Sequence, residues 1–335
     1  MASFSNAQFG YSTISKLIIE LYQIAFYDRS YQPLRGKTLI NNRVSPIQRV
    51  LIVGGTHGNE LTGAYIIKKL EKHPNQVRRS TFETVTLLAN PKAFAIVRRY
   101  IDKDLNRCFR QQDLQDLRRF SYEEIRAREI NSLFGENGKT PAEVILDLHS
   151  TTANMGLTVI TNEDPFNLRL VAYLQSVNPL VKVYLLPQPD QESSGLPSIC
   201  KLGCTIEVGV VAQGILQAEQ FQQTEALIDT ALNYLEHYNR EEIPAFDPKL
   251  TAYRYVETLD YPRNEFGEIQ SMIHPQLQFK DYEPLHPNDP LFLTFEGETI
   301  TYKGISTVYP VFINEAAYYE KGIAMCLTKK QQLTV

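Results

Sequence analysis

Short apolar runs alternate with helix-like segments between Gln48 and Asn239, and this alternation restricts the fold more than any other feature. The runs expected to be strands are RVLIVGG (49–55), TVTLLAN (84–90), AEVILDLHS (142–150), VKVYLLPQ (181–188) and CTIEVGV (204–210). Segments with apolar residues at helical spacing lie at 60–72, 121–134, 166–177 and 218–239. The second of these opens with Ser121 and Glu124, the signature of a capping box. Because strands that alternate with helices pair in parallel, we predict an α/β fold with a mostly parallel sheet flanked by helices.

The alternation stops at EEIPAFDPKL (241–250), which is typical of a linker. Beyond it, turn signals such as NEFGE and HPNDP separate short β-rich runs such as YRYVETL and LFLTF. This predicts a smaller all-β domain over 242–335 behind a larger domain over 46–241. Residues 1–45 would form an N-terminal extension, in which KLIIELYQIAF (16–26) predicts an amphipathic helix that packs on the main body.

The composition argues against several classes of protein. A net charge of −4 over 335 residues does not favour a nucleic-acid partner bound through bulk positive charge. No run approaches the ~20 apolar residues that cross a bilayer, so no membrane partner is expected. Cysteines are sparse, and Cys200 and Cys204 are spaced more widely than a CxxC metal pair, which favours buried free thiols and a cytoplasmic location. The sequence leaves the oligomeric state open, a homo-oligomer included.

Polar residues collect at the expected carboxyl ends of the strands, where open parallel sheets bind ligands. His57 and Glu60 follow the first strand, His149 closes the third, and Glu207 lies inside CTIEVGV. Imidazole and carboxylate groups suit zinc, and catalytic zinc usually takes three protein ligands and keeps an open position. His57, Glu60 and His149 are therefore candidate ligands for one zinc ion per chain, with Glu207 as a candidate general base.

Each of these residues also has a purely structural explanation. Glu60 could cap the helix that follows it, and Glu207 could pair with an arginine, because a buried carboxylate without a partner is costly. Asp147 lies two residues before His149, on the same strand face. It could orient that histidine as a second-shell residue or serve only as a satisfied strand-end carboxylate.

The segment RRYIDKDLNRCF (98–109) carries dense charge beside the expected site. Arginine is the natural partner of a carboxylate because its planar guanidinium donates paired hydrogen bonds. Asn106 and Arg107 lie in this segment, in the loop region that follows Pro91. A solvated surface would be the ordinary explanation of such a run of charges.

Together these motifs resemble the aspartoacylase/succinylglutamate desuccinylase family of zinc-carboxypeptidase-like deacylases. The resemblance rests on GGTHGNELTG (54–63), Asn90-Pro91, RYIDKDLNR (99–107), DLHSTTANMG (147–156), IEVG (206–209) and NEAAYYEK (314–321). It extends in order from about Val50 to about Lys321 and leaves residues 1 to about 40 without a counterpart.

The resemblance implies a zinc-carboxypeptidase-like fold whose C-terminal β domain caps the active site and excludes long peptides. It implies a hydrolase of linear amides that deacylates N-acyl amino acids, with N-acetyl-L-aspartate, giving acetate and L-aspartate, as the first expectation. The residues it assigns are the zinc ligands His57, Glu60 and His149, the general base and later acid Glu207, the carbonyl-polarising Arg99, and the α-carboxylate-binding Asn106, Arg107 and Tyr318.

One position departs from the family pattern. Members that act on N-acetylaspartate carry a tyrosine and, four residues later, an arginine for the side-chain carboxylate, where this chain has Ser193 and Pro197. Losing such a charge-assisted contact, worth ~1.5–3 kcal/mol, would weaken selection for an acidic side chain. Either Lys201 or Lys321 supplies the missing charge, or the enzyme prefers another N-acyl amino acid, neutral or aromatic.

Overall fold

A computed structural model describes residues 45–187 and 193–335 of the chain. The predicted N-terminal helix at 16–26 lies outside the described residues. Within the described part, no helix has the length and apolar character needed to cross a membrane. All four cysteines, Cys108, Cys200, Cys204 and Cys326, are free and buried, as predicted.

A nine-stranded sheet forms the centre of the structure, in the order β11-β12-β7-β5-β4-β6-β3-β1-β2. Its strands are β1 (Arg49–Gly54), β2 (Glu83–Leu88), β3 (Val144–Ser150), β4 (Gly156–Thr161), β5 (Val181–Leu185), β6 (Leu202–Gly209), β7 (Lys249–Leu259), β11 (Tyr309–Val311) and β12 (Met325–Thr334). The pairs β1–β2, β1–β3, β3–β6, β4–β5 and β5–β7 are parallel, which confirms the predicted mostly parallel sheet. Strand β4 was not predicted. It follows β3 through a short loop, without a crossover helix, and pairs antiparallel with β6.

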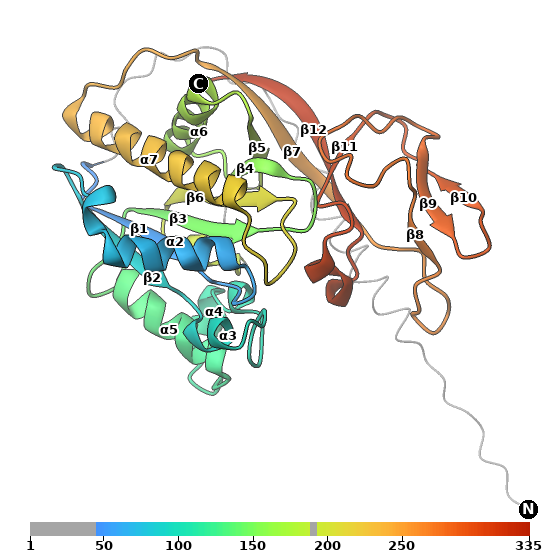
Figure 1. Ribbon diagram of the computed structural model, residues 1–335, viewed down its shortest axis with the longest axis horizontal. Helices are drawn as coiled ribbons and strands as arrows, with labels where there is room; N and C mark the ends of the chain where they lie inside the picture. The colour runs from blue at the N-terminus through green and yellow to red at the C-terminus, as the bar shows by residue number, and fades with distance from the viewer. Residues whose placement is uncertain (1–44, 188–192) are drawn as a thin grey trace, which may run out of the picture. The chain divides into compact units, whose positions relative to one another are not determined.

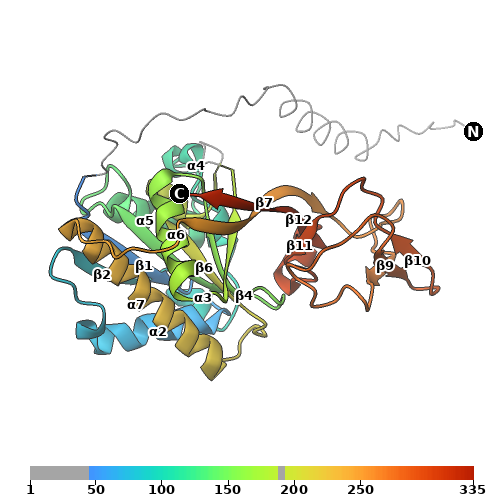
Figure 2. The same cartoon turned by 90° about the horizontal axis from the view of Figure 1, so that it is seen from above.

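Helices cover both faces of this sheet. They are α2 (Leu61–Lys72), α3 (Pro91–Ala95), α4 (Gln111–Gln115), α5 (Tyr122–Phe134), α6 (Pro165–Val177) and α7 (Ala218–Arg240), with short 3₁₀ turns η1 (Pro74–Gln76), η2 (Leu105–Arg107), η3 (Leu196–Ile199) and η4 (Ala316–Lys321). Figure 2 shows α2 and α7 on one side of the sheet and α4 and α5 on the other. The predicted capping box at Ser121 and Glu124 is present at the start of α5.

The two faces explain why β1 is an unbroken apolar run. Val50 and Ile52 pack in the cluster under α2, α6 and α7, whereas Leu51 and Val53 pack in the cluster under α5. A strand buried on both faces has no polar side to alternate with. After it, a Cβ at Gly54 would collide with the Gly63 carbonyl of α2, so only glycine permits this close helix.

The C-terminal part both extends the main sheet and forms a second one. Strands β7 and β12 pair over their full length and lead from the main sheet toward β8 (Ser271–Ile273), β9 (Pro290–Thr294) and β10 (Thr299–Thr301), as Figure 1 shows. The three-stranded sheet β10-β9-β8 surrounds its own apolar cluster. The smaller β-rich C-terminal part is thus confirmed. The exact division at 241/242 stays a prediction, because β7 continues the main sheet.

Candidate active site

The predicted site residues meet at the carboxyl ends of the parallel strands β1, β3 and β6. His57 and Glu60 lie in the turn after β1, and His149 and Glu207 lie directly opposite each other on β3 and β6. All of these side chains are buried. Residues in register on neighbouring strands project to the same face, so the fold itself brings His149 and Glu207 together.

The three predicted metal ligands form one compact cluster. The His57 Nδ1 atom lies 2.6 Å from Glu60 Oε1, and the His149 Nδ1 atom lies 2.9 Å from Glu60 Oε2. One ligand atom from each residue lies within 4.8 Å of the others. Two imidazole nitrogens and one carboxylate oxygen around a common point are a donor set that suits Zn²⁺.

The opposite ring nitrogen of each histidine is held by an aspartate. His149 Nε2 lies 2.8 Å from Asp147 Oδ2, and His57 Nε2 lies 2.9 Å from Asp104 Oδ1. Asp147 is held in turn by the hydroxyl of Thr56, at 3.0 Å. Such carboxylates fix the ring orientation and leave both Nδ1 atoms available for a metal. The residues present therefore fit a zinc ion.

Electrostatic interactions keep Glu60 and His149 ionised although both side chains are buried. Burial raises the pKa of Glu60, but His57 and His149 outweigh it and hold the pKa well below its usual range. Burial lowers the pKa of His149, but Asp147 and Glu60 outweigh it and hold that pKa well above its usual range. A cluster that favours ionised groups in the protein interior is typical of a functional site.

Glu207 contrasts with this network because its carboxyl group makes no hydrogen bond or ion pair with the residues described at 45–187 and 193–335. Burial raises its pKa well above the usual range; the His149 charge opposes this, whereas Glu60 and Glu315 reinforce it. Pairing with an arginine, the structural alternative, is not observed among those residues. A carboxyl group with a raised pKa beside a metal cluster can accept and later donate a proton near neutral pH.

The loop from 98 to 107 supplies three more predicted residues. Arg99 donates from Nη1 to Glu60 Oε1 at 3.0 Å and from Nη2 to Asp104 Oδ2 at 3.4 Å, so it lies directly beside the metal cluster. Asn106 accepts a hydrogen bond from the Leu196 amide through Oδ1, at 2.8 Å, and its Nδ2 makes no hydrogen bond within the described part. Arg107 is exposed and donates to the Asn106 carbonyl at 2.7 Å.

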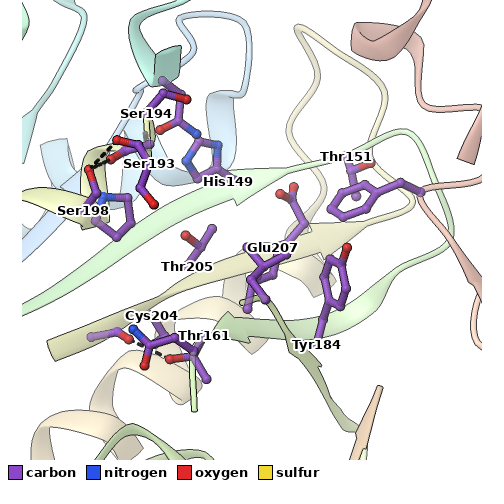
Figure 3. A pocket seen from close by; sticks show the side chains of 18 of the residues that line it. His149, Thr151, Thr161, Tyr184, Ser193, Ser194, Ser198, Cys204, Thr205 and Glu207 are labelled. Carbon is purple, nitrogen blue, oxygen red and sulfur yellow. Dashed lines mark hydrogen bonds between the residues drawn. The ribbon is translucent and has the colours of Figure 1, made fainter. Parts of the chain in front are cut away.

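A cavity of about 440 Å³ is lined by the site residues His57, Glu60, Arg99, Asn106, Arg107, His149 and Glu207. Its wall also includes Tyr318 of η4, whose ring packs on Phe312 at 5.3 Å between ring centroids. In the view of Figure 3, Glu207 lies between a group of serines, Ser193, Ser194 and Ser198, and the pair Thr151 and Tyr184. A volume of this size is in the range of small-molecule sites, roughly 300–1,000 Å³.

Another part of the cavity wall contains the position that departs from the family pattern. Ser193, Pro197 and Lys201 all line it. Lys321, the other cation considered there, donates from Nζ to Asp104 Oδ2 at 2.6 Å. Its charge is therefore already bound to the carboxylate that holds His57, and Lys201 is the lysine at this wall.

Two buried acids of the site were not predicted from the sequence. Asp104 lies inside the charged run that was interpreted through its arginines. Glu315 of the motif NEAAYYEK accepts hydrogen bonds from the Thr151 hydroxyl and from the Thr152 amide, the latter at 2.7 Å. Glu315 thereby ties the loop after β3 to η4, which carries Tyr318. The only sequence signal was the presence of both acids in motifs shared with the family.

Comparisons with known proteins identify the family and the fold. Residues 46–235 match the family model described as the succinylglutamate desuccinylase/aspartoacylase catalytic domain. Residues 248–330 match the AstE/AspA barrel-sandwich hybrid domain. The described core and the C-terminal β-rich part are thus both recognised.

Individual proteins are similar over nearly the same length. A probable aspartoacylase of Nostoc sp. is 58% identical over 290 residues, which are 86% of this chain and 98% of that protein. An N-acyl-aromatic-L-amino acid amidohydrolase (carboxylate-forming) of Homo sapiens is 43% identical over 298 residues, 87% of this chain and 93% of that protein.

Solved structures show the same fold. Murine aminoacylase 3 superposes with a TM-score of 0.81 at 39% identity, over 88% of this chain and 98% of that one. A succinylglutamate desuccinylase from Vibrio cholerae has a TM-score of 0.58 at 17% identity, over 87% and 86%, and supports the fold alone. The chain therefore belongs to the succinylglutamate desuccinylase/aspartoacylase family.

Proposed function

We propose that this protein is a zinc-dependent amidohydrolase that removes the acyl group from N-acyl amino acids. The observation that carries the proposal is the convergence of His57 Nδ1, His149 Nδ1 and the Glu60 carboxylate beside the buried Glu207, which has no hydrogen-bond or ion-pair partner in the described part of the chain. When bound there, Zn²⁺ would lower the pKa of water toward ~7 and polarise the amide carbonyl.

Glu207 would act as general base and then as general acid. In its ionised form it accepts a proton from the attacking water, and its raised pKa favours holding that proton until the more basic leaving nitrogen takes it. No other described residue opposite His149 offers a carboxylate, since the neighbouring β6 side chains in the cavity, Cys204 and Thr205, are not acids.

Arg99 would stabilise the charge that develops on the carbonyl oxygen. Its guanidinium already lies beside Glu60, and its Nε has no partner among the described residues. A fixed donor aimed at such an oxyanion is often worth about 3–4 kcal/mol. Asn106, Arg107 and Tyr318 line the same cavity and would bind the α-carboxylate of the substrate.

N-acetyl-L-aspartate is the first substrate to consider, with aspartate and acetate as products. A relative at 58% identity is named a probable aspartoacylase, which supports it. A neutral or aromatic N-acyl amino acid is the second, because Pro197 offers no charge and Lys321 is bound to Asp104. The human relative named for aromatic substrates supports this alternative.

The experiment that tests the proposal is a substrate panel on metal-replete protein. N-acetylated aspartate, alanine, phenylalanine and tyrosine would be compared by kcat/KM, with and without a chelator. We expect chelator-sensitive hydrolysis and about one zinc per chain. A wide advantage for N-acetylaspartate would eliminate the second substrate class. Stoichiometric zinc with no hydrolysis of any of the four would contradict the enzymatic proposal.

Further parts of the prediction follow from the same proposal. A small polar substrate that fits a cavity of this size needs neither a nucleic acid nor a membrane as partner. The C-terminal part would narrow the entrance, since Tyr318 and Glu315 lie in the cavity wall. Free, buried cysteines support a cytoplasmic location. The oligomeric state would be measured by light scattering, and a homo-oligomer stays a prediction.

A further inference from the structure

The loop at 98–107 carries much of the proposed chemistry although it has little regular structure of its own. Arg99, Asp104, Asn106 and Arg107 all lie on it, and only Leu105–Arg107 form a 3₁₀ turn. Several of its backbone groups therefore cannot be satisfied by a helix or strand. What holds the loop determines where the side chains of four site residues point.

Glu123, in the first turn of α5, is the principal anchor of this loop. Its carboxylate accepts hydrogen bonds from three consecutive loop amides, Ile101 at 2.7 Å, Asp102 at 3.0 Å and Lys103 at 3.1 Å. The side chain is 0% exposed. A buried carboxylate that is fully used by backbone amides fixes a loop more firmly than neutral acceptors, because charge-assisted bonds are stronger.

The same carboxylate is tied to the turn that bears the metal ligands through Asn90. Asn90 Nδ2 donates to Glu123 Oε1 at 3.1 Å, and the Asn90 amide donates to the Gly55 carbonyl at 3.0 Å. The loop also touches that turn directly, because the Gly58 amide donates to the Arg99 carbonyl at 3.1 Å. Asn90 and Glu123 thus link the Arg99 loop to the His57 turn.

Helix capping does not account for Glu123. The capping box of α5 is already complete, because Ser121 and Glu124 bond reciprocally. Glu123 is instead buried, and its carboxylate oxygens accept hydrogen bonds from the backbone of the loop at 98–107. Burying this carboxylate would cost folding free energy if the loop amides did not donate hydrogen bonds to it.

We propose that Glu123, acting with Asn90, is a positioning residue that sets Arg99, Asn106 and Arg107 relative to the metal ligands. The inference rests on the proposed amidohydrolase function and deepens it. In Glu123→Gln, one of the two acceptor oxygens becomes an NH₂ group that faces backbone N–H donors, while the side-chain volume stays nearly constant. Misplacing reacting groups by about 1 Å can cost about a hundredfold in rate.

The kinetic test compares Glu123→Gln with Glu124→Gln, a matched change at the next residue of the same helix. We expect Glu123→Gln to lose about a hundredfold in kcat/KM, with a raised KM and unchanged zinc content. Glu124→Gln should stay within about threefold of wild type, since it weakens the cap and the ion pairs with the partly exposed Lys103 and Arg119 side chains but leaves the loop amides bound to Glu123. A purely structural loss would lower the active fraction and leave KM unchanged. Equal KM and kcat/KM in both variants would overturn the inference.

Hydrogen exchange gives a readout that does not need activity. The amides of residues 101–103 should exchange about ten- to a hundredfold faster in Glu123→Gln and not in Glu124→Gln. If Glu123→Gln does not fold, Glu123→Asp retains the charge on a shorter arm and should show a smaller effect of the same kind. A wild-type protein that hydrolyses no N-acyl amino acid would contradict the proposed function. Unchanged exchange at 101–103 would contradict the anchoring alone.

Discussion

Two parts of the cavity lining, called here the metal end and the side-chain end, differ in how firmly their side chains are held. At the metal end, His57 and His149 each contact Glu60 on one ring nitrogen and an aspartate on the other. At the side-chain end, Ser193, Pro197 and Lys201 lie on and beside the short turn η3. The metal end thus has a network of hydrogen bonds on both nitrogens of each ring, whereas Lys201, the cation considered at the side-chain end, is exposed.

The difference indicates that the reaction and the substrate specificity depend on different structural requirements. A metal site needs ligands within narrow limits, and each ligand needs a second partner to hold it. A side-chain pocket needs only complementary volume and charge, so single substitutions on a turn can change its preference. Changes at the metal end should therefore affect turnover for every substrate, and changes at the other end should affect the ratio between substrates.

The largest effect is expected for Glu207→Gln. The amide cannot accept the proton of the attacking water, so kcat should fall by about a hundred- to ten-thousandfold for all substrates while zinc stays bound. Steady-state kinetics and metal analysis on the same preparation would measure both. Glu219→Gln, an exposed change of the same type on α7, is the control. Wild-type turnover in Glu207→Gln would show that the base is assigned wrongly.

Asp147→Asn should weaken zinc binding by about ten- to a hundredfold, because the amide no longer orients His149 as a carboxylate does. A competition titration against a chromophoric chelator would measure the affinity. Asp164→Asn, which keeps a helix-capping side chain at the start of α6, should leave the affinity unchanged. If both variants bind zinc as wild type does, Asp147 is only a satisfied strand-end residue.

Pro197→Arg tests the other end of the cavity. A new guanidinium at this wall should raise the preference for N-acetylaspartate over N-acetylalanine by about ten- to a hundredfold, the value of one charge-assisted contact. The ratio of the two kcat/KM values is the measurement. Pro287→Arg, in an exposed turn of the C-terminal part, is the control. An unchanged ratio would mean that the substrate side chain does not reach Pro197.

The smallest effect is expected from pH. Because the pKa of His149 lies well above 6.5, this histidine holds a proton that zinc must displace. Zinc affinity should therefore rise steadily as the pH is raised from about 6.5 to 8, by at most about tenfold per unit for the one displaced proton. Titrations at about pH 6.5, 7 and 8 would measure it. The substrate ratio should stay constant over this range, since Pro197 does not ionise.

Some elements could be predicted because their signals are local. The capping box at Ser121 and Glu124 involves residues within one helical turn, and β1 shows its burial by an unbroken apolar run. Strand β4 was missed because it breaks the alternation, following β3 through a short loop and pairing antiparallel with β6. Its neighbour is distant in sequence, so no local pattern indicates the pairing.

The residues of the candidate site likewise include some that the sequence indicates and some that it does not. His57, Glu60 and His149 could be proposed as candidates because they lie at or just after strand ends, where parallel sheets bind ligands, and Glu207 because a carboxylate inside an apolar strand is unusual. Asp104 and Glu123 were not, although both are buried acids with several partners. In the sequence they look like ordinary members of charged, helix-like or surface segments. Their function becomes visible only through the atoms that they contact.

By itself, the sequence determined the α/β core, the metal-ligand candidates and the family, because these depend on periodicity and on motifs of adjacent residues. The tertiary structure decided which carboxylates hold which histidines, and that Lys321 is bound to Asp104 rather than to the substrate pocket. The physical reason is that hydrogen bonds and ion pairs act over about 3 Å in space. Residues far apart in the chain meet at that distance only after the sheet has formed.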